Sequence, residues 1–115
     1  MVEIKKLPAV FYSTASGKEP VREWLKTLDA ADRKIVGRDI ATAEFGWPVG
    51  MPVCRSLGDG LYEIRSDLPS HRIARVIFCV ARQHMILVHG FIKKTPKTLQ
   101  TDLDLARKRR KEVTS

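Results

Sequence analysis

The sequence predicts an α+β domain in which helices pack on one antiparallel sheet. Three observations indicate this class. Apolar residues recur with helical spacing over residues 21–43, three strand-like runs separated by short turns occupy residues 61–92, and a charged helical pattern follows them. The expected order of elements is β-α-α-β-β-β-α, in a single domain covering residues 1–115.

The first expected element is a strand, AVFYST at residues 9–14, which is rich in aromatic and β-branched residues. Pro8 directly precedes it and favours an edge position, because proline cannot donate to the ladder. Two helices should follow. Pro20 suits the first turn of one, and Asp29 is an N-cap candidate for the next, which Gly46 would end. Almost no residues separate the two helices, so they should form a hairpin on one face of the sheet.

The next three strands are expected to form an antiparallel meander, because the turns between them are short. LYEIRS, at residues 61–66, alternates between two faces. RIARVIFCVA, at residues 72–81, ends in a continuous apolar run that is typical of a central strand, and MILVHGFI follows at residues 85–92. A final helix is expected from the capping pair Thr101 and Asp104 onward.

The net charge is unevenly distributed. The chain has 21 Lys and Arg against 13 Asp and Glu, a net charge of +8. Residues 93–115 hold 8 of these basic residues and 3 of the acidic ones, which gives +5 for this segment alone. A localised basic surface indicates a polyanion or an acidic protein as partner. Charge alone leaves a second interpretation open, a solvated basic helix that only aids solubility.

Several classes of protein are not expected. No apolar run approaches the roughly 18 residues of a membrane span, and the run near the N-terminus is shorter than a signal-peptide core. We therefore expect a cytoplasmic protein with no membrane association. Cys54 and Cys79 should be reduced and at least partly buried. His71, His84 and His89 lack the spacing of metal ligands, so neither a metal nor a cofactor is expected.

The polar residues within or beside the expected strands are mostly cations: Arg65, Arg72, Arg75, Lys93 and Lys94. In a meander they could converge on a concave surface that fits a phosphodiester, since arginine binds phosphate bidentately and stabilises charge on phosphoryl oxygens. Lys93 and Lys94 point to opposite faces of an extended strand, so at most one of them faces a given site.

Each of these residues also has a purely structural interpretation. Arg65 could pair with Glu63, its neighbour on the same face, and Arg72 could be solvated beside a turn. Arg75 lies in an otherwise apolar strand and requires a partner or a ligand. His89 is either a packed core histidine or a general acid–base group. Glu63 is either a general base or the partner of Arg65.

Four segments resemble, in their order along the chain, the RelE/ParE superfamily of bacterial toxins, and most closely its HigB-like, phage-derived branch: LYEIR, HRIARVIFCV, ILVHGFIKKTPKT and DLDLARKRRKE. The resemblance covers essentially the whole chain, and HGFIKKTPKT is its most specific part. It implies the toxin of a type II toxin–antitoxin system, a metal-independent endoribonuclease that cleaves mRNA on the ribosome. In such enzymes the RNA 2′-hydroxyl attacks the adjacent phosphate, and no cofactor takes part.

The resemblance also implies partners. These are a HigA-like helix-turn-helix antitoxin encoded by the neighbouring gene, the 70S ribosome and its mRNA. Operator DNA would be bound only through the complex with the antitoxin. Because the same fold serves more than one function, two alternatives stay open. One is a ParE-like inhibitor of DNA gyrase without nuclease activity, and the other is a degenerate member that only binds its antitoxin and regulates its operon.

The resemblance further implies roles for individual residues. Arg75 matches the strand arginine that contacts the scissile phosphate, Arg65 matches the arginine that closes the preceding strand, and Lys94 matches the second catalytic cation. RelE has a catalytic tyrosine near its C-terminus that the final helix here lacks, so His89 and Glu63 are the candidates for proton transfer. The expected positions for nucleic-acid binding are Lys93, Lys97, Arg72, Arg107 and Arg110.

Overall fold

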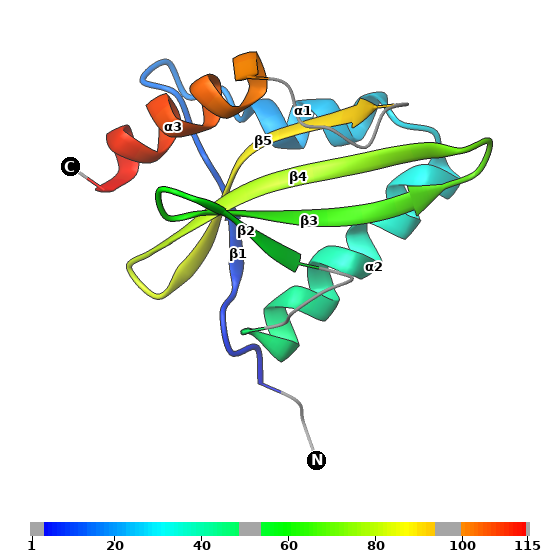
Figure 1. The fold of residues 1–115 in the computed structure, drawn as a ribbon, viewed down its shortest axis with the longest axis horizontal. Coiled ribbons are helices and arrows are strands. Elements are labelled where there is room, and N and C mark those ends of the chain that lie inside the picture. Colours follow the sequence, from blue (N-terminus) through cyan, green and yellow to red (C-terminus); the bar gives the residue numbers. More distant parts are fainter. Residues whose placement is uncertain (1–3, 49–53, 94–99, 115) are drawn as a thin grey trace.

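The computed structural model describes residues 4–48, 54–93 and 100–114. Over these residues it has five strands in one sheet and three helices, which confirms the α+β class (Figure 1). The strand order across the sheet is β1-β5-β4-β3-β2. In chain order the elements are β1 (Ala9–Phe11), α1 (Pro20–Thr27), α2 (Ala30–Gly46), β2 (Cys54–Gly58), β3 (Leu61–Leu68), β4 (Arg72–Ala81), β5 (His84–Lys93) and α3 (Gln100–Thr114).

The sheet differs from the expected meander in two respects. β1 is an edge strand as predicted, but it runs parallel to β5, so the sheet is mixed rather than wholly antiparallel. It also ends earlier than expected, at Phe11. β2 was not predicted, because its sequence CRSLG is short, mostly polar and interrupted by a register shift between Ser56 and Gly58. A strand of this kind lacks the period-2 pattern that indicates a strand.

The two N-terminal helices cover one face of the sheet. Their local signals act as predicted: Pro20 lies in the first turn of α1, and the Asp29 side chain accepts a hydrogen bond from the Asp32 amide at 2.9 Å, which caps α2. α1 packs mainly on β5 and α2 mainly on β3. The core on this face includes Val21, Val36, Ala43, Ile64, Val76, Phe78 and Met85.

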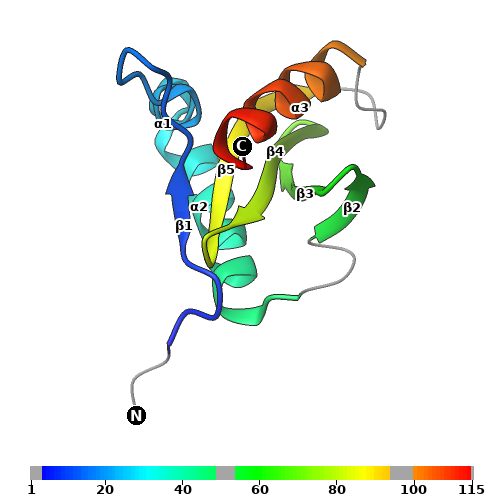
Figure 2. The same cartoon turned by 90° about the vertical axis from the view of Figure 1, so that its left-hand side faces the viewer.

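α3 lies on the opposite face, so the molecule has three layers (Figure 2). Ala106 of α3 is fully buried against a second apolar cluster that includes Ile77, Cys79 and Val88. Because both faces of β4 are covered, six consecutive residues of this strand are buried, which agrees with its prediction as the central strand.

A bulge in β5 decides which side chains face α3. Phe78 pairs with Leu87 and Ile77 pairs with His89, so Val88 is an extra residue in the ladder. From this point on the strand is out of phase with its first half. Lys93, like His89, therefore points to the side of α3, whereas Gly90 lies against the Trp24 ring of α1 on the other side.

Candidate functional site

The polar residues facing α3 form a regular array across three strands. Residues in register across β3, β4 and β5 form rows, and the central row is Arg65, Arg75 and Phe91. The two flanking rows on the same face are Glu63–Ile77–His89 and Asp67–Ile73–Lys93. Alternate residues of a strand share one face, so β3, β4 and β5 together bring most of the predicted site residues onto a single surface.

A buried ion pair lies at the centre of this array. Arg75 Nη1 is 2.5 Å from Glu63 Oε1, and both side chains are only 1% exposed. Arg55 of β2 approaches the same carboxylate oxygen, with its Nε at 3.3 Å. Two guanidinium groups thus share one buried carboxylate, which provides the partner that a buried charge requires. The two arginines and the single carboxylate together carry a net positive charge.

Arg65 is the exposed arginine of the array. Its side chain is 41% exposed, and its Nε lies 3.5 Å from Asp67, a residue on the same strand and face. The sequence had left Glu63 open as its partner, whereas Glu63 is engaged by Arg75 and Arg55. A solvent-exposed pair of this length contributes little to stability, so the Arg65 guanidinium is available to a ligand.

A second cluster joins the end of β5 to the start of α3. Asp102 lies in the first turn of α3, and its Oδ1 accepts a hydrogen bond from His89 Nε2 at 2.8 Å. Its Oδ2 is 3.3 Å from Lys93 Nζ. All three side chains are largely but not wholly buried, at 16% for His89, 18% for Asp102 and 11% for Lys93. Phe91 lies between the two basic residues, 5.4 Å from Lys93 Nζ and 5.1 Å from the His89 ring.

The chemistry of the His89–Asp102 contact follows from its donor and acceptor. An ionised carboxylate only accepts hydrogen bonds, so Nε2 must carry a proton. Nδ1 is then the ring nitrogen left to accept a hydrogen bond or a proton. The carboxylate fixes the ring in this tautomer and also lies favourably at the N-terminus of a helix. His89 is thus held by Asp102 at the border of the core, with 16% of its side chain exposed.

Asp102 is a residue that sequence reasoning missed. The capping pattern singled out Thr101 and Asp104 as neighbours on a helix, yet α3 begins at Gln100 and Asp102 faces the sheet. The only sequence signal was an acidic residue early in a basic helix. Lys94 and Lys97, which were predicted as site residues, lie outside the described residues.

Three of the residues predicted to bind nucleic acid lie elsewhere. Arg72 is on the face of α2, where its guanidinium contacts both carboxylate oxygens of Asp32 at 2.7 and 3.0 Å, and this hydrogen bonding raises the pKa of Arg72. Arg107 Nε is 2.9 Å from Asp59. Arg110 lies over Gly60, where an added Cβ would come within 2.6 Å of its Nε. Arg72 thus ties α2 to β4, and the two α3 arginines contact the turn between β2 and β3.

Within the described ranges 4–48, 54–93 and 100–114, no three His, Cys, Asp or Glu side chains form a group that could hold a metal ion. Cys54 and Cys79 are both free thiols and both buried, as expected. Burial raises the pKa of Cys54 to about 11. Within the same ranges, none of the helices is long and apolar enough to cross a bilayer.

Comparison with known proteins gives one result. The family described as "Phage derived protein Gp49-like (DUF891)" matches residues 23–111, which include most of α1, all of α2, the four strands β2 to β5 and most of α3. No curated protein matches the chain. The matched segment contains every described residue of the array and of the His89–Asp102–Lys93 cluster. The chain therefore belongs to the family of phage-derived Gp49-like proteins.

Proposed function

We propose that this protein is the toxin of a type II toxin–antitoxin pair, a metal-independent endoribonuclease that cleaves mRNA on the ribosome. The observation that carries the proposal is the arrangement on the α3 face of the sheet. There a basic array lies directly beside a histidine held by a carboxylate: Arg55, Arg65, Arg75, Lys93 and His89. Membership of a phage-derived family is consistent with it.

Cleavage of RNA needs only the groups that this face offers. The 2′-oxygen forms a bond to the adjacent phosphorus while the bond from phosphorus to the 5′-oxygen breaks. One proton leaves the 2′-hydroxyl, one is delivered to the leaving oxygen, and the products are a 2′,3′-cyclic phosphate and a 5′-hydroxyl. His89 serves one of these proton transfers, a role worth about 10²–10⁴ in rate. The array stabilises the charge that develops on the phosphoryl oxygens.

The buried position of Arg75 shapes the order of contacts. Its guanidinium faces the Glu63 carboxylate at 1% exposure, so a phosphate must compete with Glu63 to reach it. Arg65 is accessible without any rearrangement. On this proposal Arg65 and Lys93 make the first contacts with the RNA backbone, and Arg75 joins them when the phosphate displaces Glu63.

The proposed partners follow from the same hypothesis. A HigA-like helix-turn-helix antitoxin encoded by the neighbouring gene would neutralise the protein, the 70S ribosome would present the mRNA, and operator DNA would be bound only through the antitoxin complex. Such an activity belongs in the cytoplasm. Inspection of the adjacent open reading frame is the first check, because the absence of a small helix-turn-helix protein there would count against the pair.

The test is induced expression, followed by growth measurement and primer extension on cellular mRNA. We expect growth arrest and new mRNA 5′ ends. Arg65→Ala should strongly reduce both, whereas Arg82→Ala, which removes one charge from the exposed β4–β5 turn, should not. Arg75→Ala is a poorer choice, because removing one partner of a buried ion pair costs about 3–5 kcal/mol of stability and confounds loss of activity with loss of fold.

A binding function without nuclease activity is the second candidate. The observation that favours it is the same Arg75–Glu63 pair, because the central guanidinium of the array is compensated and buried. A ParE-like inhibitor would arrest growth through DNA gyrase. Intact transcripts during arrest, together with gyrase-dependent DNA damage, would replace the nuclease proposal with this one. Absence of both arrest and cleavage, with antitoxin binding retained, would identify a degenerate member.

A further inference from the structure

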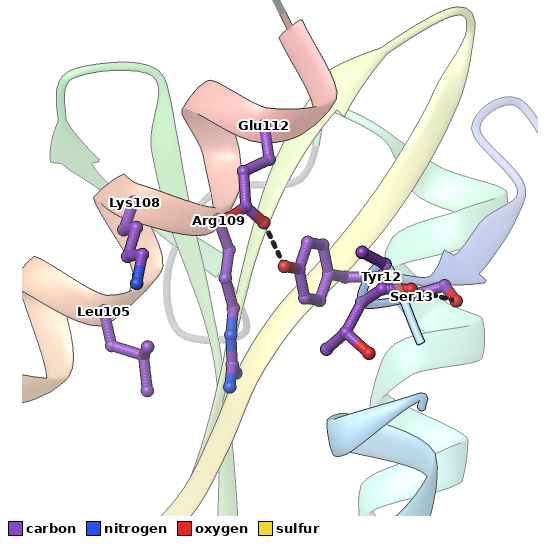
Figure 3. A pocket seen from close by; sticks show the side chains of 8 residues that line it. Tyr12, Ser13, Leu105, Lys108, Arg109 and Glu112 are labelled. Carbon is purple, nitrogen blue, oxygen red and sulfur yellow. Dashed lines mark hydrogen bonds between the residues drawn. The ribbon is translucent and has the colours of Figure 1, made fainter. Parts of the chain in front are cut away.

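A pocket lies along α3 on the C-terminal side of Asp102, the helix residue of the His89–Asp102–Lys93 cluster. Its helical lining, Leu105, Lys108, Arg109 and Glu112, recurs every three or four residues and so extends the stripe that Asp102 begins. The opposite wall comes from the chain that follows β1, residues 12–15, and the pocket measures about 560 Å³ (Figure 3).

Among the described residues, no ion pair is formed by either cation of this pocket. Arg109 Nη1 donates to the Val88 carbonyl at 2.7 Å, and the guanidinium lies 5.3 Å from the centre of the Tyr12 ring. Neither Arg109 nor Lys108 forms an ion pair with a carboxylate of the described chain, whereas the neighbouring Arg107 contacts both Asp59 and Asp104. A half-buried guanidinium without a counter-ion favours an anionic ligand.

The one acid of the lining is engaged by Tyr12. Glu112 accepts a hydrogen bond from the Tyr12 hydroxyl. That bond, with burial, raises the pKa of Tyr12, so the phenol remains a neutral donor. Figure 3 shows Glu112 directed to the Tyr12 hydroxyl, with Arg109 beside the same ring and Lys108 one residue further along the wall. The exposed Ser13 side chain adds a hydroxyl to the opposite wall.

The pocket and the candidate site share both of their supporting elements. Val88, whose carbonyl holds Arg109, directly precedes His89 on β5. On α3, Asp102 and Arg109 are seven residues apart, which corresponds to about 10 Å along the helix axis. A nucleic-acid strand lying across His89 and Lys93 could therefore place a neighbouring phosphate in the pocket.

We propose that this pocket is a phosphate subsite, in which Lys108 and Arg109 bind the backbone of the same RNA strand at a position flanking the scissile bond. The inference rests on the proposed function. Continuity with the array favours an RNA phosphate over a carboxylate of a protein partner, although the pocket chemistry suits both anions. Since the contacts are with the backbone, the subsite adds affinity without sequence preference.

The experiment measures binding of a short single-stranded RNA whose 2′-hydroxyls are methylated, so that internal attack is blocked. Lys108→Ala is compared with Lys111→Ala, which removes the same charge from an exposed position of α3 outside the pocket. We expect Lys108→Ala to weaken binding several-fold more than the control. It should also lower the slope of log affinity against log salt by about 0.7, the value for one single-strand phosphate contact.

Two outcomes would overturn the subsite. One is an equal effect of the two substitutions. The other is unchanged RNA binding by Lys108→Ala combined with weaker binding of a polyglutamate peptide, which would identify a carboxylate partner. Cleavage of unmodified RNA is measured separately. A protein that shows the Lys108 effect but cleaves no mRNA keeps the subsite and loses the nuclease proposal, and cleavage with no Lys108 effect does the reverse.

Discussion

The role proposed for His89 depends on its hydrogen bond to Asp102. The carboxylate contacts the ring and the ammonium group of Lys93 at once, so it fixes both side chains relative to the array. It is itself only partly exposed and belongs to another element of the fold. In the proposed function Asp102 would therefore be a positioning residue, acting through the two basic side chains that it holds.

Replacement of Asp102 by asparagine should leave the fold intact and impair catalysis. The amide side chain can donate to an imidazole nitrogen as well as accept from it, so the ring is no longer restricted to one tautomer. We expect kcat for cleavage to fall by about 10² or more, within the range for acid–base groups, and KM to change little. Asp102→Glu should recover part of the rate. A proportional rise in KM with unchanged kcat would indicate that Asp102 serves only substrate binding.

The buried thiol of Cys54 gives the chain a pH dependence at alkaline pH. Burial raises its pKa from 9.0 to about 11. A group whose pKa is raised by folding stabilises the native state below its unfolded pKa, and this contribution is lost as pH rises through the folded value. The free energy of unfolding should therefore decline between pH 9 and about 11. Urea titrations of the wild type and of Cys54→Ala would isolate the thiol, and parallel curves would contradict its contribution.

At the scale of elements, the contact between α1 and β5 explains the glycine of the HGF segment. A Cβ at Gly90 would lie 2.5 Å from the Trp24 ring, closer than two such atoms can approach. α1 can pack on β5 only because this position has no side chain. Packing of α1 on β5 therefore requires glycine at position 90. The residues on either side of it, His89 and Phe91, face the candidate site.

Gly90→Ala tests this contact. The indole ring is rigid and partly buried, so it cannot move aside without disturbing α1, and overpacking of this kind costs about 1–3 kcal/mol. We expect the free energy of unfolding to fall by this amount and the melting temperature to fall with it. Trp24→Leu combined with Gly90→Ala should recover part of the loss, because the smaller side chain leaves room for the methyl group. Gly37→Ala is the control, since nothing lies within 4 Å of the Cβ it would add.

At the scale of the whole molecule, the placement of helices on both faces determines where a ligand can reach the sheet. α1 and α2 pack on the face behind the array, and α3 packs on the other face over Ile77, Cys79 and Val88 (Figure 2). On the face of α3, Arg65 is the arginine of β3 whose side chain is 41% exposed. The proposed RNA site and the proposed phosphate subsite both border α3, one at each end of its sheet-facing stripe.

Much of the fold could be predicted from local patterns. The cap at Asp29, the end of α2 at Gly46 and the bounds of β4 at Arg72 and Ala81 agree with the sequence, because each depends on residues close in the chain. β2 and the parallel pairing of β1 could not, since a short polar strand has no periodic signal and the direction of an edge strand depends on the route of the chain. A period-2 pattern indicates which face of the sheet a side chain occupies, but it does not indicate which strands pair with each other.

Apart from β2, the sequence by itself determined the element types and their order, and it placed Arg65, Arg75 and His89 within strands. Tertiary structure alone decided which of these residues meet. Val88 is an extra residue in the ladder, so each side chain after it in β5 lies on the opposite face from the one that strict alternation predicts. Strict alternation from Val88 would place Lys93 on the face of α1 and α2 instead of the face of α3. The partners Glu63 and Asp102 come from β3 and α3, and such pairings follow from packing between distant segments, which no local pattern records.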